Sequence, residues 1–485
     1  MITTETLFLI SDAIISGFFS LCYLYQVFFV IFELFRIKRA RKETEPSKIH
    51  SFGVIICARN EQSVIGGLID SIKRQNYPSD LIDIFVVADN CCDYTAKYAE
   101  ASGATVFERN NQSLVGKGYA LDFAFKTLFE QGIKHDAYLI FDADNLVDRD
   151  FVKEMNLKLC DGYKVLTSYR NSKNYGTNWI TSGYSLSFIR EAAYLNKARE
   201  DLKLSCAISG TGFCVKREII EKNGGWKHHL LTEDIEFTVD SVIQGEKFGI
   251  SEKSVLFDEQ PVTFKNSWNQ RMRWAKGFYQ ILGMYGGGLL KRVFKGSFTC
   301  YDFFMTLFPA SAYTVYCVIK AIAECIYGFI TFSGDLNGFR LAFNCLWPII
   351  SCFGIMYLIF FAMGLITMIT EHKVIRATKG QKIRSVFTYP LFMLTYCPIA
   401  IAAIFKKVEW KPIPHNVKAT IDDLDNAKPI IEYVDGWKCD INKCRTVEEL
   451  PKAAYDYVKY IEKAVGCPIK YISVGASRED YIEVK

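Results

Sequence analysis

The chain has 485 residues, a formal net charge of +5 and a hydrophobic fraction of 50%. This length allows two or three domains, and the mild positive charge, which clusters beside the apolar segments, gives no indication of a nucleic-acid partner. The 16 cysteines are scattered without the paired spacing of metal-binding motifs. We therefore expect reduced thiols rather than a disulfide framework.

The first apolar segment covers residues 13–32 and contains no charged residue. It is long enough to cross a bilayer core of about 30 Å, and it lacks the basic start of a signal peptide. The basic run RIKRARK follows at 36–42, which predicts an external N-terminus and a cytosolic position for the region that follows. We expect residues 1–45 to form a transmembrane helix with a basic juxtamembrane segment.

Three further apolar segments come late in the chain, at residues 303–332, 343–370 and 386–405. The first two are typical of membrane spans, and the basic loop 371–384 that follows them is predicted to be cytosolic. The third contains Pro390 and Pro398 and is followed by Lys406 and Lys407, so a full crossing conflicts with the positive-inside bias. A proline-bent re-entrant or interfacial segment resolves that conflict.

Between the apolar segments the pattern changes to that of a soluble α/β domain. Short apolar runs of strand length alternate with helical stripes, and we expect strands at 52–58, 84–88, 106–107 and 137–141. This alternation implies a mostly parallel sheet, in which ligands bind beyond the carboxyl ends of the strands. Polar residues follow three of these strands and should converge on one crevice: Arg59, Asn60 and Glu61, then Asp89, then Asp142 and Asp144.

The two carboxylates of Asp142 and Asp144 stand directly after a buried run. A solvated turn is one explanation, since Asp and Asn favour turns. The other is a cation site, because like charges this close need a positive partner and Mg²⁺ or Mn²⁺ prefers carboxylate oxygens. Such a cation typically bridges carboxylates and phosphates, so this explanation predicts a nucleotide ligand.

Two later clusters carry candidate chemistry. Glu233 and Asp234 either begin a helix that Thr232 caps or supply a general base. In the second cluster, Gln270, Arg273 and Trp274 share one face of a helix, where an arginine and an amide could bind a diphosphate and the indole could stack on a sugar. An amphipathic helix at the membrane surface explains the second cluster equally well.

With these pieces in this order, the chain resembles the inverting, membrane-bound family 2 glycosyltransferases, which include cellulose, chitin, hyaluronan and poly-N-acetylglucosamine synthases. The resemblance covers about residues 1–410. The motifs that carry it are ARNE (58–61), VVADNCCD (86–93), GKGYAL (116–121), FDADN (141–145), SGTGF (209–213), TED (232–234) and QRMRW (270–274). One departure is Asn90, where the family often has a second acid or a glycine.

The resemblance implies an α/β GT-A fold, a UDP-sugar donor, Mg²⁺ or Mn²⁺ at Asp142 and Asp144, and Asp234 as general base with Glu233 beside it. The implied donor-binding residues are Arg59, Asn60, Glu61, Asp89, Lys117, Asp142, Asp144, Gln270, Arg271 and Arg273. The implied acceptor-binding residues are Gly210, Thr211, Gly212 and Trp274.

The resemblance further implies a cytosolic catalytic domain over 46–297 and a membrane region over 298–410, at the plasma membrane. The leading hypothesis is growth of a β-linked polysaccharide in contact with membrane lipids. A second hypothesis is transfer of one sugar to a lipid-linked acceptor, and a third is a non-enzymatic membrane protein with a nucleotide-binding regulatory domain. The sugar, the linkage and the oligomeric state stay open.

The tail, residues 411–485, is expected to be a small soluble α/β appendage with a helix at 447–465 and a strand at 469–474. It resembles the C-terminal end of adenylosuccinate synthetase, through GWKCDI, RTVEELPKAAYDYVKYIE and ISVGASR. The synthetase's phosphate loop has no counterpart in the chain, so we expect no synthetase activity. A structural appendage or a nucleotide-sensing module fits this pattern.

Overall fold

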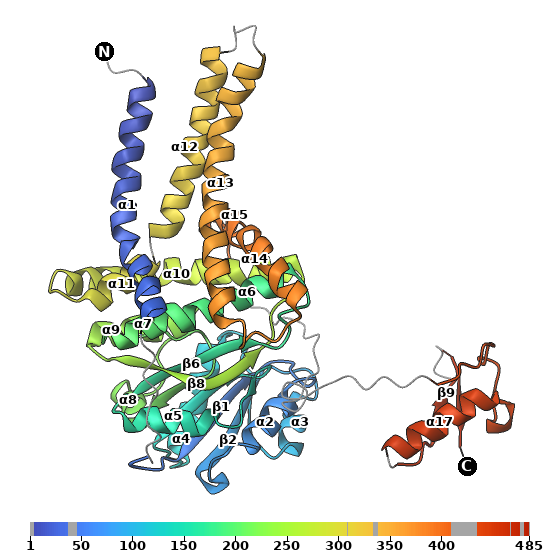
Figure 1. Cartoon of the computed structure of the whole chain (residues 1–485). Helices are drawn as coiled ribbons and strands as arrows, with labels where there is room; N and C mark the ends of the chain where they lie inside the picture. The colour runs from blue at the N-terminus through green and yellow to red at the C-terminus, as the bar shows by residue number, and fades with distance from the viewer. Residues whose placement is uncertain are drawn as a thin grey trace. The chain divides into compact units, whose positions relative to one another are not determined.

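The computed structural model describes residues 4–36, 46–307, 309–332, 338–408, 434–465, 467–475 and 480–484. The chain divides into two compact units, Met1–Asp425 and Asn426–Lys485 (Figure 1). The expected boundary between residues 410 and 411 falls in 409–433, outside the described residues, and stays a prediction.

The first unit contains one eight-stranded sheet with the strand order β3-β2-β1-β4-β7-β6-β8-β5. The strands are β1 (Phe52–Ala58), β2 (Ile82–Asp89), β3 (Thr105–Arg109), β4 (Ala137–Asp142), β5 (Leu146–Val147), β6 (Val165–Ser172), β7 (Phe213–Lys216) and β8 (Phe248–Asp258). Neighbours among β1 to β4 pair in parallel, as predicted. β7 is antiparallel to both of its neighbours, which makes the sheet mixed.

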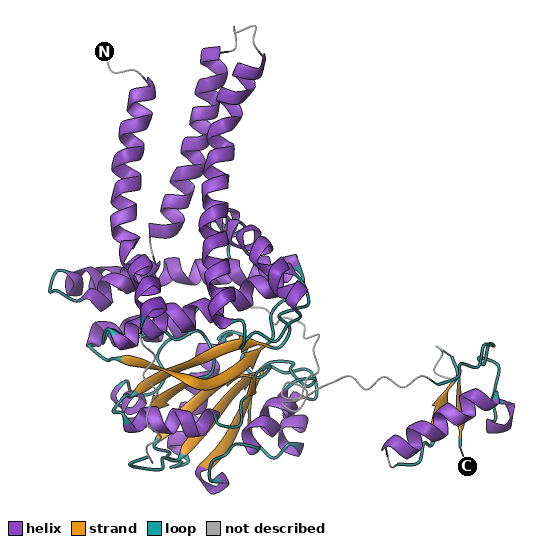
Figure 2. Cartoon of the chain, viewed as in Figure 1, coloured by secondary structure: helices purple, strands orange, loops and turns teal. Residues whose placement is uncertain are grey.

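Both faces of the parallel half are apolar because helices cover each of them. Along β1, Ile55 packs with the cluster that contains Leu121, whereas Val54 packs with the cluster that contains Leu68. The covering helices include α2 (Ile65–Lys73), α3 (Thr95–Ala101), α4 (Lys117–Glu130), α5 (Phe151–Cys160), α6 (Trp179–Arg190), α8 (Arg217–Lys222) and α9 (Glu233–Gln244) (Figure 2).

The register of the parallel strands fixes where the polar strand tips lie. Cys57 of β1 pairs with Asp142 of β4, and Ala58 pairs with Ala88 of β2. The residues that follow β1, β2 and β4 therefore leave the sheet at the same edge.

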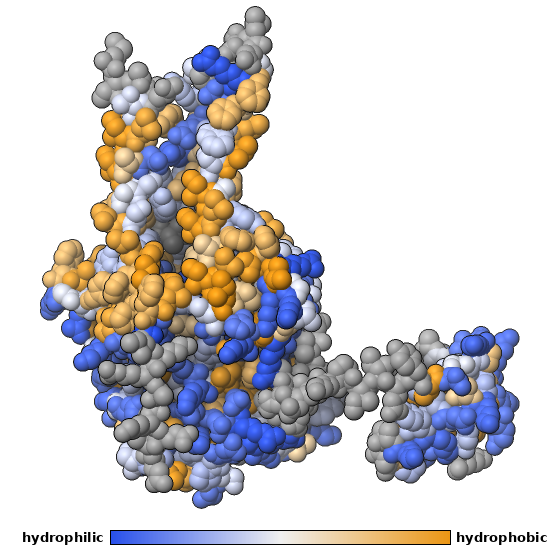
Figure 3. All heavy atoms as spheres, viewed as in Figure 1, coloured by the Kyte–Doolittle hydropathy of each residue, from blue (hydrophilic) through white to orange (hydrophobic). Residues whose placement is uncertain are grey.

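Helices on one side of the sheet form two groups (Figure 1). The helices that lie across the α/β domain are α10 (Phe264–Val293), α11 (Phe298–Leu307), α14 (Lys379–Leu394) and α15 (Tyr396–Phe405). The helices that rise away from it are α1 (Thr4–Phe35), α12 (Pro309–Phe332) and α13 (Gly338–Glu371). Figure 3 shows hydrophobic atoms gathered on these helices, whereas the α/β domain is mainly hydrophilic.

Within the described residues, four helical stretches are long and apolar enough to cross a membrane: Thr6–Phe35, Ala312–Thr331, Gly338–Glu371 and Lys379–Phe405. The expected segment 303–332 is divided between α11 and α12. The expected bend in 386–405 is present, because α14 and α15 meet at Thr395. These two helices pack on α6 and α10.

A buried ion pair links the membrane helices to the α/β domain. Arg199, on the short helix α7 (Lys197–Asp201), donates to both carboxylate oxygens of Asp302 on α11, at 2.7 and 3.0 Å. The Tyr25 hydroxyl of α1 donates to the same carboxylate at 2.8 Å. One carboxylate therefore connects three elements that are far apart in sequence.

The second unit has the predicted α/β character. It contains a 3₁₀ turn (Val447–Glu449), α17 (Lys452–Val465) and an antiparallel hairpin of β9 (Tyr471–Ser473) and β10 (Tyr481–Glu483). Its small core is Leu450, Ala454, Val474 and Ile482. The sequence indicated the helix and β9, but not the partner strand β10.

Candidate functional site

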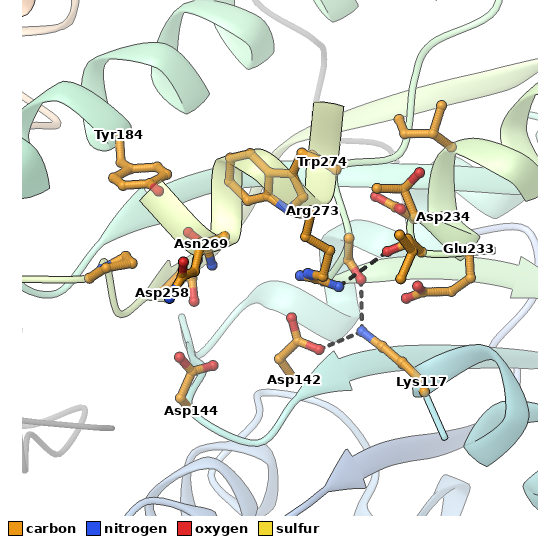
Figure 4. Close-up of a pocket in the computed structure, with 18 of the residues that line it drawn as sticks. Lys117, Asp142, Asp144, Tyr184, Glu233, Asp234, Asp258, Asn269, Arg273 and Trp274 are labelled. Carbon is orange, nitrogen blue, oxygen red and sulfur yellow. Dashed lines mark hydrogen bonds and ion pairs between the residues drawn. The ribbon is translucent and has the colours of Figure 1, made fainter. Parts of the chain in front are cut away.

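A cavity of about 920 Å³ opens at the carboxyl ends of β1, β2 and β4, beneath α6 and α10. Most of the predicted site residues line it: Arg59, Glu61, Asp89, Lys117, Asp142, Asp144, Gly210, Glu233, Asp234, Gln270, Arg273 and Trp274. In Figure 4, Arg273 extends toward Asp142, the indole of Trp274 lies on the side of Tyr184, and Glu233 and Asp234 lie on the other side of Arg273.

Lys117 supplies a positive partner for Asp142. Its ammonium group donates to the carboxylate of Asp142 at 2.5 Å and to the carbonyl of Gly210 at 2.8 Å. Burial alone would lower the pKa of Lys117, but the carboxylates of Asp142 and Glu233 outweigh burial and raise this pKa. Lys117 is therefore a permanent cation that joins α4 to the end of β4.

The start of α4 is placed by close packing. A Cβ atom on Gly118 would collide with the backbone carbonyl of His228, in the loop that leads to α9. Gly116, just before the helix, has a φ of +142°, which favours glycine. These two glycines bring Lys117 close to the acidic start of α9.

Asp144 faces the cavity beside a hydrogen-bonded amide. The side chain of Asn145 donates to Asp144 at 3.1 Å and to Asp258, at the end of β8, also at 3.1 Å. Among the described residues, no three His, Cys, Asp or Glu side chains are arranged to hold a metal ion. Asp142 and Asp144 could thus provide only part of a coordination sphere, and phosphate oxygens and water would supply the other ligands.

Glu233 and Asp234 are the first two residues of α9. Burial raises the pKa of Glu233 to about 7, with a further increase from the charge of Asp234. Burial also raises the pKa of Asp234, although Lys117 and Arg273 oppose this shift. The Thr232 side chain forms no capping hydrogen bond, so helix capping alone does not explain the acidic pair. A buried carboxylate with a raised pKa, facing a cavity, is typical of a general base.

The helix α10 presents Gln270, Arg273 and Trp274 to the cavity, as their spacing predicted. The Arg273 guanidinium donates to the carbonyl of Leu231 at 3.2 Å, which holds the loop before Glu233. The indole of Trp274 packs against two rings of α6, with centroids 5.7 Å from Tyr184 and 6.0 Å from Phe188.

The structure does not support a donor-binding role for Arg271. This side chain is fully buried and lies outside the cavity lining. It donates to the carbonyl of Phe392 at 3.1 Å and to the Thr395 hydroxyl at 2.7 Å. One residue along a helix turns the side chain by about 100°, so Arg271 faces the junction of α14 and α15 instead of the cavity.

Three other predicted residues also lie outside the cavity lining. Thr211 accepts a hydrogen bond from the Asp142 backbone at 2.8 Å, and a Cβ on Gly212 would collide with Leu256. Asn60 accepts from the Cys92 backbone at 2.8 Å and so connects the loop after β1 to the loop after β2. Only Gly210 of the glycine-rich segment reaches the cavity, where a Cβ would lie 3.6 Å from the Asp234 carboxylate.

The structure adds residues that the sequence interpretation missed. Arg109 binds Asp89 at 2.5 Å, and these residues are paired across β2 and β3. Arg170 of β6 forms an ion pair with Asp258 and donates to the carbonyl of Ser209 at 2.6 Å. Arg109 could have been found from its place at the third strand tip, but Arg170 lies in the half of the sheet that the sequence did not reveal.

Comparison with known families agrees with the fold and the cavity. Residues 50–277 match the family model described as "Glycosyltransferase like family 2", and residues 390–482 match the adenylosuccinate synthetase model. The match to the glycosyltransferase family covers the part of the chain that contains the mixed eight-stranded sheet. The curated proteins that are similar to the chain include glycosyltransferases and adenylosuccinate synthetases.

Among curated proteins, the "Probable glycosyltransferase YdaM" of Bacillus subtilis is 27% identical over 246 residues, which is 46% of this chain and 54% of the relative. A beta-monoglucosyldiacylglycerol synthase of Synechocystis sp. is 26% identical over 233 residues, or 47% of each chain. An adenylosuccinate synthetase of Synechococcus sp. is 44% identical over 64 residues, 13% of this chain and 15% of the relative. The chain spans about half the length of the curated glycosyltransferases it matches.

Among solved structures, the mannosyltransferase PcManGT from Pyrobaculum calidifontis, in complex with GDP-Man and Mn²⁺, is 13% identical with a TM-score of 0.45. That alignment covers 81% of this chain and 99% of the mannosyltransferase.

Proposed function

We propose that this chain is a membrane-bound glycosyltransferase that moves a hexosyl group from a nucleotide-diphosphate sugar, UDP-linked as the resemblance implies, to a hydroxyl acceptor. The observation that carries this proposal is that acidic and cationic side chains line one cavity. A buried acidic pair, Glu233 and Asp234, faces a cationic group, Arg273, with Asp142 and Asp144 at the sheet edge. Group transfer needs both a base for the nucleophile and positive charge for the leaving group.

The donor would occupy the side of the cavity at the strand tips. Arg59 and Asp89 line the part nearest β1 and β2, where the nucleoside belongs, and Arg109 fixes the Asp89 carboxylate. A divalent cation between Asp142, Asp144 and the diphosphate, when bound, would neutralise the phosphate charge. Mg²⁺ and Mn²⁺ both suit this oxygen-only ligand set, and one structurally similar mannosyltransferase was crystallised with Mn²⁺.

Asp234 would accept the proton of the acceptor hydroxyl. Its raised pKa brings the carboxylate closer to the basicity that proton abstraction requires. The acceptor oxygen then forms a bond to the anomeric carbon while the bond from that carbon to the diphosphate oxygen breaks. Attack opposite the leaving group inverts the anomeric centre, and Arg273 and Lys117 stabilise the charge that develops on the departing nucleotide.

The first candidate for the acceptor, which the motifs favour, is a growing β-linked polysaccharide. Transfer of one sugar to a lipid-borne acceptor is the second candidate, and one observation favours it. The cavity lining includes Tyr396 on the apolar helix α15 and Val408 just after it, so an acceptor held in a bilayer would lie next to the cavity. A relative is also named for a glycosylated diacylglycerol.

Product length separates these two candidates. Purified full-length protein in lipid nanodiscs would be given radiolabelled UDP-glucose, UDP-N-acetylglucosamine or UDP-glucuronate with Mg²⁺ or Mn²⁺, and the products would be separated by size. Polymer synthesis yields products that lengthen with time, and single transfer yields one labelled lipid. Release of nucleotide without a glycosylated product from every donor would refute both candidates.

We also propose that the catalytic domain faces the cytosol of the plasma membrane. The basic residues that flank the helices support this orientation, because positive loops stay cytosolic. Labelling of Cys92, an exposed thiol of the α/β domain, by a membrane-impermeant maleimide in intact cells and in lysed cells tests it. Cys92 should react only after lysis, and labelling in intact cells would reverse the orientation.

A further inference from the structure

A carboxylate without a part in the proposed transfer, Glu191, lines the same cavity. It begins a π-helix, Glu191–Asn196, that connects α6 to α7. Such insertions in α-helices re-aim side chains and occur frequently at functional sites. Ser187 and Phe188, one helical turn earlier, also line the cavity, so one helix face presents three side chains to it.

The Glu191 carboxylate has no hydrogen bond or ion pair with any residue that the structure describes. Burial raises its pKa, and the charges of Arg199, Arg170 and Arg190 oppose the shift. Two of these arginines are already paired, Arg199 with Asp302 and Arg170 with Asp258. Glu191 is partly exposed to the cavity, so this carboxylate is suited to a ligand that brings its own hydrogen-bond donors.

The surroundings of Glu191 indicate which ligand fits. The aromatic rings of Tyr184, Phe188 and Trp274 line the cavity with it, and Trp274 meets the other two edge to face. A sugar or glycerol unit offers C–H groups to aromatic rings and hydroxyl donors to a carboxylate. Asp234 lies near enough to raise the pKa of Glu191 further, so an acceptor with its own negative charge would meet two carboxylates.

We propose that Glu191 is an acceptor-binding residue that accepts hydrogen bonds from a neutral polyhydroxyl unit and disfavours acceptors that carry a carboxylate at the same place. This inference rests on the proposed glycosyltransferase function and adds the acceptor class. Lys407 also lines the cavity, after α15, but forms no ion pair with Glu191 in the described structure. The selectivity therefore depends on a carboxylate that forms no ion pair with any described residue.

The test uses two matched acceptors, octyl β-glucoside and octyl β-glucuronide, with purified full-length protein and the UDP-sugar that it hydrolyses fastest. The wild type should prefer the neutral glucoside. In Glu191→Gln, kcat/KM for the glucoside should fall by roughly 10- to 100-fold, the effect of losing a hydrogen bond to a charged group. Most of that fall should appear in the acceptor KM, and the preference over the glucuronide should shrink or vanish.

Acceptor-independent hydrolysis of the donor serves as the folding control. It should be unchanged in Glu191→Gln, and Glu191→Asp should keep the preference for the neutral glycoside. Glu130→Gln, a change of the same kind at an exposed position at the end of α4, should alter neither property.

Three results would overturn the inference: equal selectivity in the wild type and Glu191→Gln, transfer to neither glycoside, or loss of donor hydrolysis together with transfer in both Glu191 variants. A wild type that neither hydrolyses nor transfers from any UDP-sugar is a different result, because it refutes the proposed function itself.

Discussion

Replacing Asp234 with asparagine separates proton transfer from the rest of the site. Asparagine keeps the size of the side chain but cannot act as a base. General-base catalysis typically contributes about 10²- to 10⁴-fold, so kcat should fall by that factor, which corresponds to roughly 3–5 kcal/mol in the activation barrier. Lys117 and Arg273 remain in place on the donor side, so the affinity for the UDP-sugar should change little.

The assay pairs two measurements on the same purified protein. Transfer of radiolabelled sugar gives kcat, and calorimetric titration with UDP gives the nucleotide affinity. Asp80→Asn, at an exposed position in the turn before β2, is the matched control and should behave as the wild type. An Asp234→Asn enzyme with kcat close to the wild-type value would refute the assignment of the base. A large loss of UDP affinity would place Asp234 in the donor site instead.

Further predictions concern the neighbouring acid, the metal and the buried ion pair. Because burial and Asp234 raise the pKa of Glu233 to about 7, the folded state holds this proton tightly and its contribution to stability is lost as the pH rises through about 7. Glu233→Gln should therefore remove that pH dependence from urea denaturation, and an unchanged profile would contradict the assignment. Asp144→Ala, or chelation by EDTA, should abolish metal-dependent binding of the UDP-sugar while thermal unfolding in detergent stays cooperative; normal affinity in that variant would favour a simple turn. Asp302→Asn leaves the buried guanidinium of Arg199 without its charged partner, so the free energy of unfolding should fall by about 3–5 kcal/mol, and a loss below about 1 kcal/mol would show that the pair contributes little.

The parallel half of the sheet could be predicted because its signals are local. Runs such as 52–58 and 137–141 are apolar on both faces, and polar residues follow each of them. Residues at their tips must lie together once the strands are parallel. Arg59, Asp89 and Asp142 are therefore predicted to lie at one edge from the sequence pattern alone.

The strands of the other half of the sheet, such as β6 and β8, could not be predicted from the sequence because polar contacts hold them in place. The strand β6 is buried throughout, yet its second half contains Arg170 and Asn171, and a register shift interrupts its pairing with β8 between Ser168 and Tyr169. No apolar period marks such a strand. Its partners, including Asp258, lie far along the chain, so only the folded structure reveals them.

Some residues that the motifs predict to bind ligand are sequence neighbours of cavity residues but do not line the cavity themselves. Arg271 stands between Gln270 and Arg273 in sequence, but helical periodicity directs it to a different face of α10, against Thr395. Thr211 and Gly212 adjoin Gly210 and serve close packing. No sequence pattern marks Glu191, because a π-helix alters the side-chain direction without an evident change in the pattern.

The most direct test of the account measures sugar transfer from a panel of labelled UDP-sugars by the wild type and by Asp234→Asn, in nanodiscs with Mn²⁺. We expect a β-linked glycosylated product from at least one donor with the wild type, and a loss of that product in the variant while UDP still binds. A wild type that binds UDP but glycosylates no acceptor would contradict the account and favour a nucleotide-binding regulatory domain.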